Sequence, residues 1–315
     1  MFLTPEILTL QIVNFIFFSF ATIAFFLSTK IFLKWDSTSS TQQQYKLEKQ
    51  SYLASIIIKY ILLFKIPLFI FFIFTLDKLS NIITGAMCAA GIVDATDYGS
   101  FLVIIKVINL YLFGFWLILH AKDIEKETLP YTKYKFGLFL FIYIIFTFEI
   151  FIELIMFNAI DIQQIVLCCG TLFSASSTSF ISLIFDINPL IVISIFYLNF
   201  FFIVLFKILN QKELFALSNL LFILTSIVSL IVFFGTYIYE LPTHHCPFCF
   251  LQKEYNYIGY AIYILLFIGT FNGIVSGFIK NNHKSIKNSL LFNFLYLLVV
   301  SAYPLIYFLN NGVWL

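Results

Sequence analysis

Arginine is absent from this 315-residue chain, and charge of either sign is scarce. Charged residues make up 11% of the sequence, against 61% hydrophobic and 20% aromatic residues. A water-soluble domain could not keep such a composition solvated. The sequence also lacks a Walker loop, a dinucleotide-binding glycine fingerprint and a basic patch for nucleic acid. These absences argue against a soluble nucleotide-dependent enzyme and against a nucleic-acid partner, and they favour the lipid bilayer as the solvent.

Long apolar runs recur along the chain with charged breaks between them, and a helix needs roughly 20 apolar residues to cross a bilayer. We therefore predict an all-α membrane protein, a polytopic bundle of about eight transmembrane helices that forms a single domain over residues 1–315. The first lysine is residue 30, so a signal peptide's basic segment is missing and the first run should remain a span. The predicted spans are 8–33, 52–76, 101–119, 136–160, 190–209, 214–239, 257–279 and 289–309.

The connections between spans differ in charge. Of the 18 lysines, thirteen lie at or between the ends that join spans one and two, three and four, five and six, and seven and eight. The other loops carry only Lys78 and Lys253. The positive-inside rule then predicts exoplasmic termini and exoplasmic loops at 77–100, 161–189 and 240–256. In a bacterium this means the inner membrane, with these loops in the periplasm. Residues 34–51, rich in Ser, Thr and Gln, predict a flexible cytoplasmic linker.

The cysteines all fall on the predicted exoplasmic side, where disulfides persist. Cys246 and Cys249 form a Cys-x-x-Cys directly after His244 and His245. This pattern is typical of a dithiol that exchanges electrons or of a site that holds a soft metal ion. The motif stands just before the seventh span, so the positive end of that helix and the two imidazoles favour the thiolate form.

The segment that begins at this motif and ends at Lys253 reads Cys-Pro-Phe-Cys-Phe-Leu-Gln-Lys. Its pattern, Cys-Pro-x-Cys-x-x-Gln-Lys at the outer end of a helix, resembles DsbB and the vitamin K epoxide reductase-like proteins, which are quinone-linked disulfide-generating membrane proteins. The resemblance implies that Cys246 and Cys249 exchange electrons with a quinone and with a periplasmic thiol protein. It also implies that Lys253, the basic residue four positions after the second cysteine, assists. The family has four spans, whereas eight are predicted here.

The other three cysteines leave several arrangements open. Cys168 and Cys169 are neighbours, and adjacent Cα atoms lie about 3.8 Å apart, below the usual disulfide range of about 4.4 to 6.8 Å. Either one of them pairs with Cys88 and leaves an odd thiol, or the whole set acts as thiolates. In the second case these three residues would join the Cys-x-x-Cys in electron exchange.

The same side chains also suit a metal. A membrane protein that binds Cu(I) or Zn(II), or passes it to a metallochaperone, would use such soft ligands. A third alternative is a structural subunit of a membrane complex whose cysteines only staple loops together. The candidate metal ligands are His244, His245, Cys246, Cys249, Cys168, Cys169, Cys88 and Met87.

Charged side chains within the spans form a second candidate site. Glu149 and Glu153 lie four residues apart and therefore on one face of the fourth span, where carboxylates are costly unless they are paired. Depth along the helices, counted at the helical rise, predicts the pairs Lys65 with Glu149 and Lys106 with Glu153. Such pairs either specify helix packing or form a proton relay to a redox or transport site.

Three glycines on the seventh span follow a four-residue spacing: Gly269, Gly273 and Gly277. Small residues at that spacing allow another helix to approach closely. The stripe therefore predicts helix packing and not a chemical site.

Overall fold

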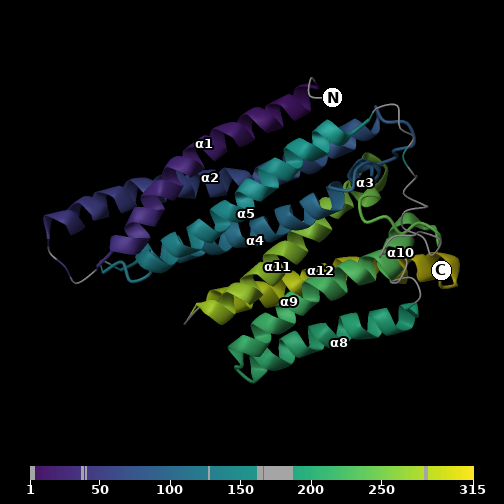
Figure 1. The fold of residues 1–315 in the computed structure, drawn as a ribbon. Helices are drawn as coiled ribbons and strands as arrows, with labels where there is room; N and C mark the ends of the chain where they lie inside the picture. The colour runs from purple at the N-terminus through teal and green to yellow at the C-terminus, as the bar shows by residue number, and fades with distance from the viewer. Residues whose placement is uncertain are drawn as a thin grey trace. The chain divides into compact units, whose positions relative to one another are not determined.

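The protein is all-helical in the residues that the computed structural model describes, namely 4–36, 39, 41–126, 128–161, 166, 187–279 and 283–315. Eight of its helices are long and apolar enough to cross a membrane (Figure 1). The predicted class, an all-α membrane protein with eight spans, is therefore confirmed. Each predicted span coincides with one of these helices.

The chain separates into two compact units of four spans each. Unit 1, over Met1–Ile82 and Ile92–Gln164, contains α1, α2, α4 and α5. Unit 2, over Ile83–Gly91 and Ile165–Leu315, contains α8, α9, α11 and α12. The segment Ile83–Gly91 follows α2 in sequence and packs with unit 2, so Cys88 belongs to the same unit as the Cys-x-x-Cys.

In unit 1 the helices are α1 (Pro5–Lys34), α2 (Gln42–Ser80), α4 (Gly99–Ile124) and α5 (Thr132–Ala159). They form a ring of neighbours in which α1 packs on α2 and α5, and α4 packs on the same two helices. Aliphatic and aromatic side chains, with Trp116 and Phe136 among the fully buried ones, fill the interior.

In unit 2 the first span is α8 (Pro189–Ile208), and α9 (Lys212–Ser229) continues through the π-helical turn η1 (Leu230–Phe234) into α10 (Gly235–Tyr239). The last two spans are α11 (Ile258–Phe278) and α12 (His283–Asn311). Neighbouring pairs are α8 with α9, α9 with α11, and α11 with α12. A π-helical turn inside an α-helix often marks a functional site, and η1 lies next to the loop that carries the Cys-x-x-Cys.

The glycine stripe on α11 packs as predicted. A side chain at Gly269 would overlap Asn293 of α12, and one at Gly273 would overlap Asn219 of α9. Asn219 Oδ1 accepts hydrogen bonds from Asn293 Nδ2 at 2.8 Å and from Ser289 Oγ at 3.1 Å. The glycines thus let three helices meet around a small buried amide cluster.

The predicted linker at 34–51 is only partly correct, because α2 already begins at Gln42. Thr41 caps this helix by accepting a hydrogen bond from the Gln44 backbone N–H at 3.3 Å. Gln44 and Leu47 are buried, which gives the polar first turns of α2 a packed face. The polar composition of this segment gave no indication of the buried face. The connection between α1 and α2 therefore covers residues 35–41 only.

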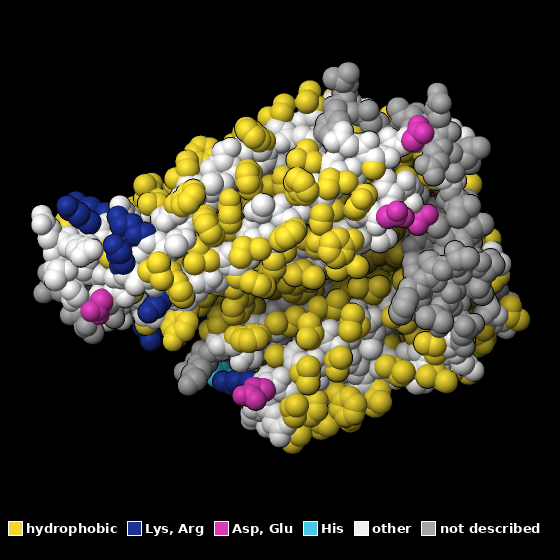
Figure 2. Space-filling model, viewed as in Figure 1, with side chains coloured by type: hydrophobic (Ala, Val, Ile, Leu, Met, Phe, Trp, Pro, Cys, Tyr) yellow, Lys and Arg dark blue, Asp and Glu magenta, His cyan; other side chains and the backbone are white. Residues whose placement is uncertain are grey.

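The lipid-facing surface is apolar, as a bilayer requires. Large side chains such as Phe15 and Phe26 are about 70% exposed on α1, and Figure 2 shows hydrophobic side chains along the helices of both units. In unit 1 the Lys side chains gather at the end where α1 joins α2 and α4 joins α5 (Figure 2). This placement agrees with the lysine bias of the sequence.

A buried three-cysteine cluster and a buried charged network

Cys88 is held in a tight turn before the short helix α3 (Ala89–Asp94). Gly85 has a φ of +92°, a conformation that side chains disfavour, and a Cβ there would overlap the Val166 carbonyl. The Val166 N–H donates to Thr84 O at 3.2 Å, which anchors the same turn. The turn thereby buries Cys88 completely.

The Cys-x-x-Cys loop is held by two tyrosine hydroxyls. Tyr239, at the end of α10, donates to the Cys246 carbonyl and accepts from the Phe250 N–H at 3.1 Å. Tyr263 of α11 donates to the Pro247 carbonyl at 2.7 Å. These bonds satisfy backbone groups that a buried loop would otherwise leave without partners, and they fix the backbone from Cys246 to Phe250.

Two further contacts position the second cysteine. Cys249 begins the 3₁₀ turn η2 (Cys249–Leu251), which lies so close to α11 that a side chain at Gly259 would overlap Phe250. Gln252 Nε2 donates to the Met87 carbonyl at 2.9 Å and so joins this loop to the turn that carries Cys88.

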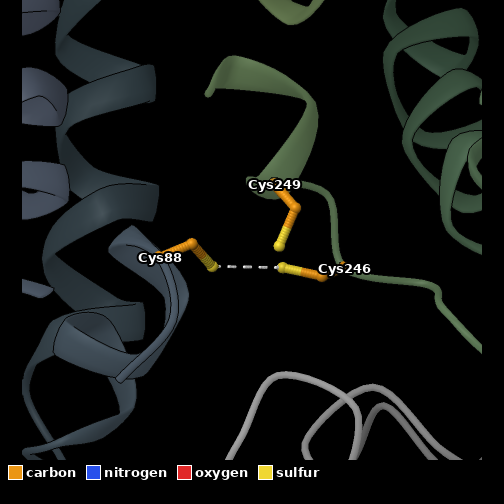
Figure 3. Close-up of side chains that lie close together, drawn as sticks. All are labelled: Cys88, Cys246 and Cys249. Atoms are coloured by element: carbon orange, nitrogen blue, oxygen red, sulfur yellow. Dashed lines mark hydrogen bonds between the residues drawn. The ribbon is translucent and has the colours of Figure 1, made fainter. Parts of the chain in front are cut away.

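The three sulfur atoms converge (Figure 3). Cys88 Sγ lies 3.6 Å from Cys246 Sγ, a thiol contact that is well beyond the roughly 2.05 Å of a disulfide bond. All three sulfur atoms, including that of Cys249, lie within 4.8 Å of one another. Cys88 and Cys246 are 0% exposed and Cys249 is 5% exposed. Two loops separated by more than 150 residues therefore build one buried thiol site.

The surroundings of this site are apolar and aromatic. The three cysteines belong to one hydrophobic core with Tyr239 and Phe250. Burial, together with the electrostatic influence of Cys249, raises the pKa of Tyr255 above its ordinary value, so this neighbouring phenol stays neutral at physiological pH. Low polarity strengthens any electrostatic interaction that a thiolate makes here.

The histidines predicted as ligands do not join the three sulfur atoms. Among the described residues, the group close enough to hold one metal ion consists of the three cysteines alone. The His244 ring packs edge-on against Tyr239 at 4.4 Å between centroids. His245 Nδ1 forms a 2.8 Å hydrogen bond with the Ile231 carbonyl of η1, so this residue anchors the loop to the π-helical turn.

The remaining predicted site residues are found elsewhere. Met87 is 64% exposed, and its carbonyl accepts the hydrogen bond from Gln252 of the loop. Lys253 begins the exposed 3₁₀ turn η3 (Lys253–Tyr255). Cys168 and Cys169 lie outside the described residues.

Unit 1 contains the second buried polar site, and both predicted ion pairs are present in it. Lys65 Nζ lies 3.0 Å from Glu149 Oε1, and Lys106 Nζ lies 2.6 Å from Glu153 Oε2. Lys106 also contacts Glu149 Oε1 at 2.8 Å, so a single lysine bridges the two carboxylates. All four side chains are at most 6% exposed. Interior charges in a spanning bundle are functional-site candidates by default.

Three amides that the sequence reasoning did not single out complete this network. Asn14 of α1 donates to Glu153 at 2.8 Å and accepts from Lys65 at 3.0 Å, and Gln11 donates to Glu153 at 3.2 Å. Asn109 of α4 donates to Glu149 Oε2 at 2.5 Å. These amides stand among apolar residues in the sequence, so no motif marked them. Their rotational position around the helix axis, compared with that of the predicted ion pairs, is the pattern that would have indicated them.

No family model, no curated protein and no solved structure matches the chain.

Proposed function

We propose that the protein is a membrane thiol–disulfide oxidoreductase whose working centre is the Cys88, Cys246 and Cys249 cluster. The observation that carries this proposal is the 3.6 Å contact between Cys88 Sγ and Cys246 Sγ, with the third sulfur within 4.8 Å of both. Reacting atoms at about 3 to 3.5 Å are close to an attack geometry. Cys246 can therefore exchange its sulfur partner between Cys249 and Cys88 with little movement.

The exchange balances as follows. When Cys246 and Cys249 form a disulfide, the Cys88 thiolate attacks Cys246 Sγ, the Cys88–Cys246 bond forms, and Cys249 leaves as a thiolate. Net oxidation of two of these thiols transfers two electrons and two protons to an acceptor. The resemblance to the DsbB and vitamin K epoxide reductase-like proteins supports a quinone, which becomes a quinol, with a periplasmic thiol protein as the exchange partner and Lys253 assisting.

The proposal places the cluster on the exoplasmic side, since thirteen lysines lie on the opposite loops and only two on this side. Thr243 lies in the exposed part of the Cys-x-x-Cys loop, and Lys126 is exposed in the connection between α4 and α5. A membrane-impermeant maleimide applied to intact cells should label a Thr243→Cys variant and spare a Lys126→Cys variant. The reverse pattern would refute this orientation.

The redox proposal is tested by trapping thiols with acid in membranes and counting them by a mass-tagged maleimide. The wild-type protein should lose two reactive thiols when the quinone pool is oxidised and regain them when it is reduced. In a Cys249→Ser variant the Cys246–Cys249 disulfide cannot form, so oxidation should join Cys246 directly to its 3.6 Å neighbour Cys88, and a further Cys88→Ser change should remove this bond. A thiol count that stays constant in every quinone state contradicts the proposal.

A soft metal ion is the second candidate, because the sulfur separations also suit it. Three thiolates at about 2.3 Å around one ion lie about 4 Å from each other, close to the spacing in this cluster. Thiolates select Cu(I) and Zn(II). Under this alternative the purified protein carries one copper or zinc ion per chain, a Cys88→Ser variant loses it, and a Met87→Leu variant keeps it. Metal-free wild-type protein after purification with added Cu(I) or Zn(II) would eliminate the alternative.

A further inference from the structure

The charged network of unit 1 divides its charges unequally between its two lysines. Lys106 contacts both Glu149 and Glu153. Within the described part of the chain, the one carboxylate that Lys65 contacts is Glu149, on the same Oε1 atom that Lys106 contacts, and its other polar partner is the neutral amide of Asn14. The two ammonium groups therefore compete for one carboxylate oxygen. Because Lys65 has no carboxylate of its own, its charged form is the least stabilised of the four buried charges.

Among the described residues, the polar and charged groups around Lys65 come from α1, α4 and α5. They are Asn14 from α1, Lys106 and Asn109 from α4, and Glu149 from α5, where the Phe146 ring also lies 4.7 Å from Lys65 Nζ. Glu153 is further along α5 and is held by Lys106, Asn14 and Gln11. Loss of one proton from Lys65 leaves both Lys106 ion pairs intact. The net charge of the network can therefore change by one unit while these ion pairs hold the helices together.

A small cavity lies beside this group. It is lined by Lys65, Lys106 and Glu149, with apolar side chains on the other sides, and offers about 10 Å³ to the centre of a water molecule. That is about the volume that one water requires. Asn109 does not line this cavity, but it donates to Glu149, and within the described residues its Oδ1 is buried without a hydrogen-bond partner; ordered water commonly satisfies a buried acceptor of this kind.

We propose that this network is a proton-exchange site in the membrane-spanning part of unit 1, in which Lys65 gives up and regains the proton and a single water in the adjoining cavity carries it. The proton is the ligand, and Glu149 is the group that holds Lys65 in place. The site is independent of the thiol chemistry in unit 2. We expect uptake and release of this proton to be coupled to the activity of the protein in the membrane.

The test compares Lys65 with Lys106 in one molecule by trace acetylation with acetic anhydride, which modifies only neutral amines. The purified full chain in lipid nanodiscs is labelled at neutral pH and mapped by mass spectrometry. Both lysines are similarly buried and line the same cavity, so access to the reagent is matched. Lys65 should react roughly tenfold faster than Lys106, the factor that about 1.4 kcal/mol of differential interaction gives.

A Glu153→Gln variant sharpens the test, because it removes the second carboxylate of Lys106 and should bring the two labelling rates together. The wild-type comparison stands even where this variant fails to fold. If neither lysine reacts in the folded protein while both react after denaturation, the network is a static ion-pair lock and the proposal is wrong. It is equally wrong if Lys106 reacts as fast as Lys65 in the wild type.

Discussion

Removal of the Glu149 carboxylate should be among the most damaging single changes in unit 1. Glu149 accepts from Lys65 at 3.0 Å, Lys106 at 2.8 Å and Asn109 at 2.5 Å, at 2% exposure. In Glu149→Gln the ammonium of Lys65 stays buried without a counter-charge, and breaking a buried pair in this way costs about 3–5 kcal/mol. A Lys65→Met change in the same chain removes the stranded charge and leaves the Lys106–Glu153 pair. The double variant should therefore recover about 1–2 kcal/mol relative to Glu149→Gln, within the coupling range of about 0.5–3 kcal/mol for contacting residues.

The free energy of unfolding is measured in mixed micelles by titration with a denaturing detergent, followed by circular dichroism. The exposed pair of Lys122 and Glu125, at 2.7 Å with side chains 37% and 57% exposed, supplies the control. Glu125→Gln should cost at most about 0.5 kcal/mol, because exposed pairs contribute little. The reasoning is refuted if Glu149→Gln costs no more than Glu125→Gln, or if the Glu149 and Lys65 substitutions together cost the sum of the single ones.

Three further outcomes concern unit 2. Gly259→Val should push η2 away from α11 and cost about 1–3 kcal/mol through overpacking, with loss of thiol exchange but normal membrane insertion; thiol trapping together with membrane fractionation checks this. Tyr239→Phe removes the hydroxyl that satisfies the Cys246 carbonyl and should lower the free energy of unfolding by about 1–3 kcal/mol, whereas an unchanged thermal unfolding curve would contradict it. Gly273→Ala should also destabilise by about 1–3 kcal/mol because its methyl meets Asn219, and a melting temperature equal to that of the wild type would show that the helices can separate freely there.

The spans and the two ion pairs were predictable because a bilayer imposes simple rules on sequence. Apolar length determines whether a helix crosses, and residues at matching depth on neighbouring helices meet. Lys65 and Glu149 are both near the middle of their spans, so counting along each helix sufficed to pair them. The bridge from Lys106 to Glu149 was missed because depth alone ignores rotation about the helix axis, which decides how many partners a long side chain reaches.

The partner of the Cys-x-x-Cys was not predictable by the same reasoning. Loops have no fixed rise per residue, and Cys88 could as well have paired with Cys168 or Cys169 on sequence grounds. Its position depends on the turn at Gly85, whose positive φ suits glycine, and on the bond from Gln252 to the Met87 carbonyl. Neither feature leaves a periodic pattern. The contacts of the two histidines were likewise invisible in the sequence: the His244 ring packs against Tyr239, and His245 Nδ1 forms a hydrogen bond with the Ile231 carbonyl.

The two buried sites differ in what their burial implies. Neutral thiols are among the side chains most often found inside proteins, so the burial of three cysteines costs little, and only their convergence from two distant loops indicates a function. Four charged side chains are costly in the same surroundings, and well-packed apolar residues often replace such a network without loss of stability. Stability alone therefore gives no reason for Lys65, Lys106, Glu149 and Glu153 to lie inside a membrane bundle. A network that binds and releases a proton does have a reason to keep charged side chains inside the bundle. Because Glu149 is shared unequally between the two lysines, Lys65 is the residue at which we expect the proton to be released.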